Sequence, residues 1–377
     1  MQRRDVIKLL GSTSATLALP TWAQNDNRPI VLGQSAAFSG PAAELGVQMN
    51  KGAKVYFDHV NATGGINGRP IQILTADDGY EPDRCKANTE KLIREDVFAL
   101  FGYVGTPTCV AAMPLATEAR IPFFGPFTGA QSLREPFNRY VFHLRASYYD
   151  ETALIVNQLT SLGLNKIAVF RQNDSYGQAG LDGVVRALSP MGLAPVAVGK
   201  VERNSVDVAA AVAEIVAKKP NAVVQISAYK SCAAFIREAR KAGYGGTFYN
   251  VSFVGTQALA DELGPDGLGV VVSQVVPFPF STTMAITREY LDAVQRTGSD
   301  AKPNYSSMEG YMAAKVFTEG LRRAASRLLT REALVAALET IQGVNFGGFL
   351  VNFGPRDHVA SRFVELSMLT ADGRVRR

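Results

Sequence analysis

The 377-residue sequence has only three histidines and three cysteines, and it lacks the short motifs that mark many enzymes. His59, His143 and His358 each stand apart from the cysteine, acidic or second-histidine spacings of a metal site. There is no Gly-x-Ser-x-Gly nucleophile turn and no Gly-x-Gly-x-x-Gly phosphate loop. The sequence therefore predicts a protein that is not an enzyme and that holds no metal or cofactor.

One pair of acidic residues invites a different interpretation. Asp77 and Asp78 follow a predicted strand, where dinucleotide-binding folds carry an acid for the ribose. The first predicted strand, however, leads into residues 35–41, SAAFSGP, which is not the glycine fingerprint of that fold. Nicotinamide chemistry is therefore disfavoured, and Asp174, beside Tyr176, is interpreted as a turn residue.

Long hydrophobic runs are also missing. An apolar run from Val6 to Leu19 follows Arg3-Arg4 and precedes Thr21-Trp22-Ala23, the order found in an export signal. This run is shorter than the ~20 apolar residues that span a bilayer, and no later segment reaches that length. We expect residues 1–23 to be removed on export to the periplasm, by the twin-arginine or the ordinary secretory route. No cysteine follows the run, so no lipid anchor is expected.

The charge is close to balanced. Removing residues 1–23 takes away three basic residues and one acidic residue, which leaves 36 basic and 33 acidic side chains. A nucleic-acid-binding protein shows a clustered basic stripe, whereas here only a short tail, Arg374 to Arg377, is basic. No nucleic-acid partner is therefore expected, and the ~350 remaining residues suffice for two domains of typical size.

The cysteines fit an oxidising compartment without requiring one. Cys85 and Cys109 lie on neighbouring predicted helices and are candidates for a disulfide, the alternative being two separate buried thiols. Cys232 is left over and is interpreted as a small core residue.

Apolar strand-like runs alternate with segments of helical period along most of the chain. Strands are predicted at 30–34, 71–76, 99–102, 123–124, 166–171, 194–199, 222–226, 246–250 and 270–276. Helices are predicted between them and after them, for example at 42–61, 84–96, 149–161, 177–190, 206–218, 230–242, 283–297, 307–326 and 330–340. This alternation predicts an α/β protein with parallel, doubly wound sheets. Because the pattern restarts near residues 145–150, two lobes with a ligand crevice at the carboxyl ends of the strands are expected.

One turn is suited to an anion. Residues 98–129 predict two buried strands and a helix whose start lies at Gly105-Thr106-Pro107. Thr106 can cap this helix, and proline is favoured at its first positions. Free backbone N–H groups at a helix start bind a carboxylate without a buried cation. The turn therefore predicts capture of a small acid, unless Thr106 and water alone satisfy these groups.

Five segments in consistent order resemble the periplasmic leucine/isoleucine/valine-binding proteins of ABC uptake systems. They are VLGQSAAFSGPA (31–42), NATGGINGRPI (61–71), DDGYEP (77–82), FGYVGTPT (101–108) and QNDSYGQAG (172–180). The resemblance covers nearly the whole mature chain. It implies the type I periplasmic binding protein fold: two Rossmann-like lobes joined by three hinge crossings, which close on a ligand.

The resemblance also implies where the lobes divide. The crossings are expected near 145–147, 275–280 and 343–352. Lobe one then contains 24–146 and 278–345, and lobe two contains 147–277 and 346–377.

Family binding positions are carried over one at a time. The carboxylate seat falls on Gly105 and Thr106, and the next contact loop falls on Phe127, Thr128 and Gly129. The family has a threonine at the position of Gly129, so the hydroxyl of Thr128 is expected to replace it. From lobe two, Tyr176 and Tyr229 are expected to cover an apolar ligand body.

The family's glutamate for a ligand ammonium is missing. Its position falls near Ser252, and no acid follows until Asp261. A buried ammonium without a carboxylate is costly, so an uncharged or aromatic acid is favoured over an α-amino acid. Further candidate contacts are Tyr103, Tyr148, Phe253 and Ser39, although such aromatics also serve as core residues and Ser39 can cap a helix.

The resemblance implies a monomeric solute-binding protein that delivers a small carboxylate to inner-membrane ABC permease subunits. A ligand sensor of the same fold for a membrane receptor or regulator is the alternative.

Overall fold

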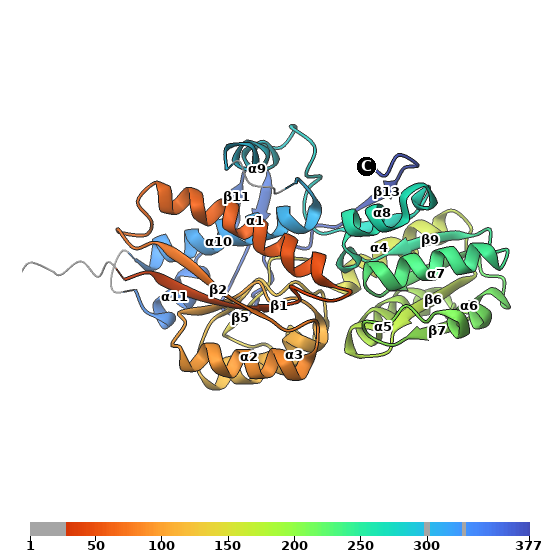
Figure 1. Ribbon diagram of the computed structural model, residues 1–377, viewed down its shortest axis with the longest axis horizontal. Coiled ribbons are helices and arrows are strands. Elements are labelled where there is room, and N and C mark those ends of the chain that lie inside the picture. The colour runs from red at the N-terminus through yellow and green to blue at the C-terminus, as the bar shows by residue number, and fades with distance from the viewer. Residues whose placement is uncertain (1–27, 298–301, 326–328) are drawn as a thin grey trace, which may run out of the picture.

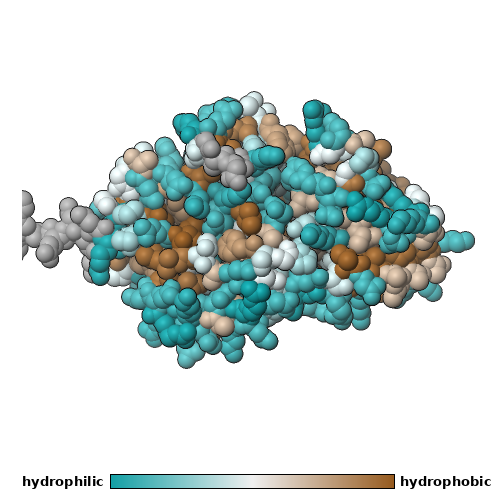
Figure 2. All heavy atoms as spheres, viewed as in Figure 1, coloured by the Kyte–Doolittle hydropathy of each residue, from teal (hydrophilic) through white to brown (hydrophobic). Residues whose placement is uncertain are grey.

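The computed structural model describes residues 28–297, 302–325 and 329–377. The predicted export signal, residues 1–23, lies outside the described residues. The chain forms two α/β lobes that lie side by side along the long axis of the molecule (Figure 1). Hydrophilic residues cover most of the face in Figure 2, and hydrophobic residues appear in smaller areas on both lobes.

Lobe one is built on a parallel five-stranded sheet. Its strands, in spatial order, are β2 (Ile71–Asp77), β1 (Ile30–Ala36), β3 (Ala99–Phe101), β4 (Phe123–Phe124) and β5 (Val141–Phe142). The helices of this lobe are α1 (Ala43–Ala62), α2 (Pro82–Arg94), α3 (Thr106–Glu118), α9 (Ala285–Arg296), α10 (Tyr305–Ala324) and α11 (Arg331–Leu338). Long helices α1 and α10 pack against each other, which brings residues from the two ends of the chain into one core.

Lobe two is built on a seven-stranded sheet. Its strands, in spatial order, are β14 (Val375–Arg376), β13 (Glu365–Leu369), β10 (Val271–Gln274), β9 (Thr247–Asn250), β8 (Ala222–Ile226), β6 (Ile167–Gln172) and β7 (Val198–Val201). The strands from β10 to β7 are parallel, whereas β13 and β14 join as antiparallel neighbours. The helices are α4 (Tyr148–Ser161), α5 (Ser175–Leu188), α6 (Ala209–Val216), α7 (Tyr229–Lys241) and α8 (Thr256–Leu263). The predicted doubly wound, parallel-dominated α/β fold is confirmed.

Local sequence explains these elements. Every residue of β6 and of β8 is buried, because helices cover both faces of a parallel sheet and such strands are near-continuous apolar runs. Short 3₁₀ helices add turns at Gln131–Leu133, Ser189–Met191, Ser252–Val254 and Gly264–Gly267.

Three segments connect the lobes. The first runs from β5 to α4 and the second from β10 to α9, close to the predicted positions. The third crossing lies later than the predicted 343–352. Those residues form the hairpin of β11 (Val344–Phe346) and β12 (Phe349–Val351), and β11 lies beside α9 of lobe one in Figure 1.

The chain stays with lobe one beyond this hairpin. The backbone N–H of Phe353 donates to Ile341 O at 2.7 Å, and that of Ala360 donates to His143 O at 2.8 Å. The third crossing therefore occupies residues 361–364, and the 346–360 stretch assigned to lobe two packs on lobe one.

Candidate functional site

The carboxyl ends of strands from both lobes meet around the ring of Phe253. The ring centroid of Phe253 lies 4.6 Å from that of Tyr176, 5.7 Å from that of Phe127 and 5.9 Å from that of Tyr80. Tyr148, at the end of the first crossing, packs on Tyr176 at 5.4 Å. We call these five residues the interlobe aromatic cluster. All five are buried, so the lobes are in contact and the cluster becomes accessible from solvent only when they separate.

The predicted carboxylate seat lies at the edge of this cluster. Helix α3 begins at Thr106, its N-cap is Gly105 at φ +100° and ψ 150°, and no described side chain caps it. The expectation that Thr106 caps the helix is therefore wrong. Its Oγ1 is instead hydrogen-bonded to Thr128 Oγ1 at 2.7 Å, so the N-terminal backbone N–H groups of α3 remain available to an anion.

Thr128 continues the hydroxyl chain. Its Oγ1 donates to the hydroxyl of Tyr148 at 3.3 Å, which links the seat to the first crossing. At Gly129, an added Cβ would lie 2.6 Å from Tyr148 Cδ1 and 2.7 Å from its backbone N. Because Tyr148 fills this space, a threonine does not fit at Gly129, and the hydroxyl that this loop carries is that of the preceding residue, Thr128.

Tyr176 brings an unused donor from lobe two. It lies in the first turn of α5, where Asp174 is the N-cap and accepts from the N–H groups of Tyr176 and Gly177. Asp174, interpreted from the sequence as a turn residue, therefore caps α5. The Tyr176 hydroxyl is buried without a hydrogen-bond partner among the described residues. Burial raises its pKa well above the usual value, so the hydroxyl keeps its proton and can donate to a ligand oxygen.

Three predicted contacts lie away from the cluster. Tyr103 belongs to a separate core of lobe one, where its ring packs on Phe123 and its hydroxyl meets Thr89 Oγ1 at 3.2 Å. Ser39 is exposed and donates through Oγ to Asp77 at 2.5 Å, which ties two loops together. Its other expected role, as helix cap, is also not taken, because the N-cap of α1 is Ala42.

Tyr229, the third of these residues, also lies outside the aromatic cluster. It begins α7, and its hydroxyl lies close to the backbone of Glu44 in lobe one. It therefore joins the two lobes at a separate contact outside the aromatic cluster.

A buried acid lies next to Ser252, contrary to the sequence argument. Glu151, in the first turn of α4, accepts from Ser252 N at 2.7 Å, from Ser252 Oγ at 3.1 Å and from Ser273 Oγ at 2.6 Å. Burial raises the pKa of Glu151, against the opposing effect of Arg145 and these hydrogen bonds. The case against an α-amino acid that rested on a missing carboxylate therefore no longer holds.

Sequence reasoning missed Tyr80 as a site residue. Its hydroxyl accepts from Gln172 Nε2 of lobe two at 3.2 Å, and its backbone has φ +65°, which is unusual for a bulky side chain. The Tyr80 N–H donates to Asp78 Oδ1 at 2.8 Å, and burial raises the pKa of Asp78 to about 6. The Asp-Asp-Gly-Tyr sequence was a signal for this turn, because aspartates accept from backbone N–H groups two residues ahead.

A buried ion pair forms the floor beneath Phe127. Arg145, in the first crossing, donates to both carboxylate oxygens of Glu309 in α10, at 2.8 and 2.6 Å. Its guanidinium lies 4.2 Å from the ring centroid of Phe127, and its Nη1 is buried without a partner among the described residues. A cavity of about 10 Å³, room for about one water, lies between this pair and Ser252.

A polar contact between the lobes lies beside Tyr80. Arg203 Nη2 of lobe two is 2.7 Å from Glu81 Oε2 of lobe one, and Asn204 Nδ2 donates to Glu81 Oε1 at 2.8 Å. Asn204 Nδ2 also lies 3.0 Å from the carbonyl of Gly79. We call Glu81, Arg203 and Asn204 the interlobe latch, because these bonds exist only when the lobes touch.

The cysteines are free thiols. Cys85 and Cys109 are buried in the same apolar cluster of lobe one without a bond between them, and Cys232 is buried in the other core. The arrangement matches the alternative of buried thiols, and burial raises the pKa of all three. Within the described residues, no group of three or more histidine, cysteine or acidic side chains is placed to hold a metal. The same part of the chain contains no helix long and apolar enough to cross a membrane.

Comparisons with known proteins agree with this fold. The family model described as periplasmic binding protein matches residues 29–374. The Leu/Ile/Val-binding protein homolog 7 of Brucella abortus (strain 2308) is 25% identical over 327 residues, which cover 81% of this chain and 80% of that protein.

Two solved structures are similar over nearly their whole length. A possible leucine/isoleucine/valine-binding protein from Rhodopirellula baltica SH 1 has 35% identity and a TM-score of 0.88, covering 92% of this chain and 96% of that chain. A substrate-binding periplasmic protein from Ralstonia solanacearum has 32% identity and a TM-score of 0.87, covering 92% of this chain and 99% of that chain.

Proposed function

The chain belongs to the periplasmic binding protein family of the Leu/Ile/Val-binding type, and from this premise we propose that it captures a small carboxylate for an ABC uptake system. One observation carries the proposal. The hydroxyls of Thr106 and Thr128 lie 2.7 Å apart at the uncapped start of α3, beside aromatic rings contributed by both lobes. Such a site offers an anion seat at one end and apolar walls around the remainder of the ligand.

Binding proceeds by hinge closure in this proposal. The carboxylate first meets the α3 N-terminus and the loop at Phe127–Gly129 on lobe one. Lobe two then brings Tyr176 and Phe253 over the ligand body, and the latch residues join across the gap. The closed, monomeric form would dock on inner-membrane permease subunits after export to the periplasm through the signal at residues 1–23.

The residues of the interlobe aromatic cluster indicate the class of ligand. Five aromatic rings favour a carboxylate with a flat or apolar body, and Tyr176 offers its hydroxyl to a further oxygen. Since Glu151 lies below Ser252, an amino acid remains compatible as well. Sensing for a membrane receptor is the second candidate function, because the same closure can report occupancy.

A thermal-shift screen of residues 24–377 tests the proposal directly. The panel contains benzoate-like acids, aliphatic acids, amides and branched-chain amino acids, and calorimetry follows each hit. A ligand that binds only the folded state raises the melting temperature by mass action. Shifts with amides and none with any acid would contradict the carboxylate seat.

Thr106→Ala is expected to weaken binding of a confirmed acid by roughly 10- to 100-fold, because a hydrogen bond to a charged group contributes about 1.5–3 kcal/mol. Calorimetry measures the change. Thr117→Ala is the matched control, since Thr117 lies near the other end of the same helix and bonds to Met113 O. Equal affinity of wild type and Thr106→Ala would refute the seat.

The ion pair of the interlobe latch is expected to stabilise the closed form, and the size of this contribution should depend on salt concentration. Glu81→Gln removes the charge that faces Arg203, and half-exposed pairs of this kind contribute about 0.2–1 kcal/mol. We expect up to a fivefold loss of ligand affinity at low salt that shrinks at high salt, measured by calorimetry at both ionic strengths. Glu238→Gln, which removes an exposed pair with Lys241 within α7, should leave affinity unchanged at either salt concentration. A salt-independent loss would place the role of Glu81 outside the ion pair.

A further inference from the structure

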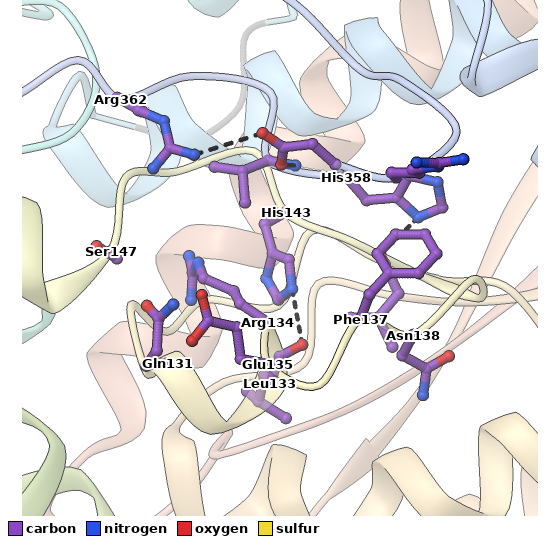
Figure 3. Close-up of a pocket in the computed structure, with 14 residues that line it drawn as sticks. Gln131, Leu133, Arg134, Glu135, Phe137, Asn138, His143, Ser147, His358 and Arg362 are labelled. Atoms are coloured by element: carbon purple, nitrogen blue, oxygen red, sulfur yellow. Dashed lines mark hydrogen bonds and ion pairs between the residues drawn. The ribbon is translucent and has the colours of Figure 1, made fainter.

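A second pocket lies on lobe one beside the hinge, and none of the five residues of the aromatic cluster lines it. It has a volume of about 290 Å³, at the lower end of small-molecule sites. Residues between 131 and 147 form one wall, and residues between 356 and 362 form the other. Both segments run directly into crossings between the lobes. We call this the hinge pocket; Figure 3 shows its side chains.

His143 supplies a buried, unused acceptor to this pocket. Its Nε2 lies 3.0 Å from the carbonyl of Leu133, and because a carbonyl only accepts, Nε2 carries the hydrogen. Burial and the charge of Arg134 lower the pKa of His143 well below its usual value, so the ring is neutral. Nδ1 therefore presents a lone pair, and it has no partner among the described residues. A ligand group that satisfies it must be a hydrogen-bond donor.

Three arginines line the same pocket and call for a negatively charged ligand group that accepts hydrogen bonds. The Nη groups of Arg134 are held by backbone carbonyls, including Ala130 O at 2.8 Å and Arg145 O at 3.1 Å, while its buried Nε has no described partner. Arg356 and Arg362 line the mouth of the pocket and are exposed. Glu135 and Asp357 also line the pocket, and Arg362 Nη2 lies 3.4 Å from Asp357 Oδ2, so three guanidinium groups and two carboxylates leave the lining with a net positive charge.

The side chains gather around one cavity. Figure 3 shows His143 in the middle of the set, with Arg134 and Arg362 on one side and Phe137 and His358 on the other. Phe137 packs edge-on against His358 and adds an apolar wall. The pocket thus combines positive charge, one buried acceptor and one aromatic surface.

We propose that the hinge pocket is a second binding site, which takes a small oxyanion that also carries a hydroxyl group. The anionic oxygens accept from Arg134, Arg356 and Arg362, and the hydroxyl donates to His143 Nδ1. A phosphate monoester of a small polyol and a short hydroxycarboxylate share this chemistry. The site is separate from the carboxylate seat at Thr106.

Calorimetry with matched probes tests the site. Thr106→Ala protein is titrated with glycerol 3-phosphate and with propyl phosphate, which lacks the hydroxyls, and then with lactate and with propionate. In at least one pair the hydroxylated probe is expected to bind roughly tenfold more tightly, because its partner leaves His143 Nδ1 unsatisfied. The pair that responds identifies the source of the ligand. Absence of binding by all four probes at millimolar concentration, or equal affinity within both pairs, would overturn the proposal.

A charge-matched pair of variants locates the binding. Arg356→Gln/Arg362→Gln removes two exposed arginines from the pocket and should lower affinity for the responding probe roughly tenfold. Arg374→Gln/Arg376→Gln removes two exposed arginines near the C-terminus and should leave it unchanged. Equal affinities of the two double variants would place the anion elsewhere. Both substitutions lie on the surface, so the fold is expected to tolerate them.

Discussion

Glu309→Gln is expected to lower the free energy of unfolding by about 3–5 kcal/mol, because it leaves the Arg145 guanidinium buried without its carboxylate. The pair is almost fully enclosed, with side-chain exposures of 1% and 3%, so bulk water cannot solvate the guanidinium once its partner is lost. The pair also ties the first crossing to α10, and it lies under Phe127 of the aromatic cluster. Equilibrium urea denaturation measures the loss.

Two further variants separate charge burial from other effects. Glu289→Gln removes a carboxylate that pairs with Lys315 at a half-exposed site and should cost less than about 1 kcal/mol. Arg145→Met/Glu309→Met replaces the whole pair by apolar side chains and should recover most of the stability. If Glu309→Gln unfolds at the same urea concentration as wild type, Arg145 has another partner.

Sequence patterns predicted the fold where burial is continuous. Strands β6 and β8 are mostly apolar runs with both faces covered, and runs of this kind stand out from the surrounding helices. The two-residue strand β5 was missed, although β4, of the same length, was predicted at 123–124; a strand this short shows no period of its own. The hairpin of β11 and β12 was missed as well, and with it the position of the third crossing.

Part of the candidate site could be predicted from local sequence, whereas the contacts between distant segments could not. The proposed seat at Thr106 follows from local turn chemistry and the proposed role of Thr128 from the family resemblance, and the structure brings the two hydroxyls together. Glu151 was missed because it lies 101 residues before Ser252 in sequence, and only the packing of α4 against β10 makes them neighbours. The prediction that Tyr103 contacts the ligand was wrong, because its place after a strand did not reveal which face of the sheet it occupies.

Gly105→Ala is expected to disrupt both the fold and the ligand seat. Gly105 has φ +100°, where an alanine is strained by about 1–3 kcal/mol. The added Cβ would also lie 2.2 Å from Tyr80 Cε2 and 3.0 Å from Thr108 Oγ1. Tyr80 cannot move freely, because Asp78 holds its backbone and Phe253 packs on its ring. Overpacking of this kind costs about another 1–3 kcal/mol, measured as the loss of unfolding free energy.

A second glycine provides a control that separates backbone strain from the collision of the added Cβ with Tyr80. Gly64 has φ +101°, and an added Cβ there meets nothing within 4 Å, so Gly64→Ala carries a comparable strain without the collision. We expect Gly64→Ala to lose some stability and to keep wild-type affinity for the acid ligand. Gly105→Ala should lose more stability and at least tenfold in affinity, because either α3 or Tyr80 must shift and the Thr106 seat lies between them. If the two variants behave alike in both measurements, the close packing of Tyr80 on Gly105 contributes nothing to the seat, and the backbone conformation alone explains the glycine.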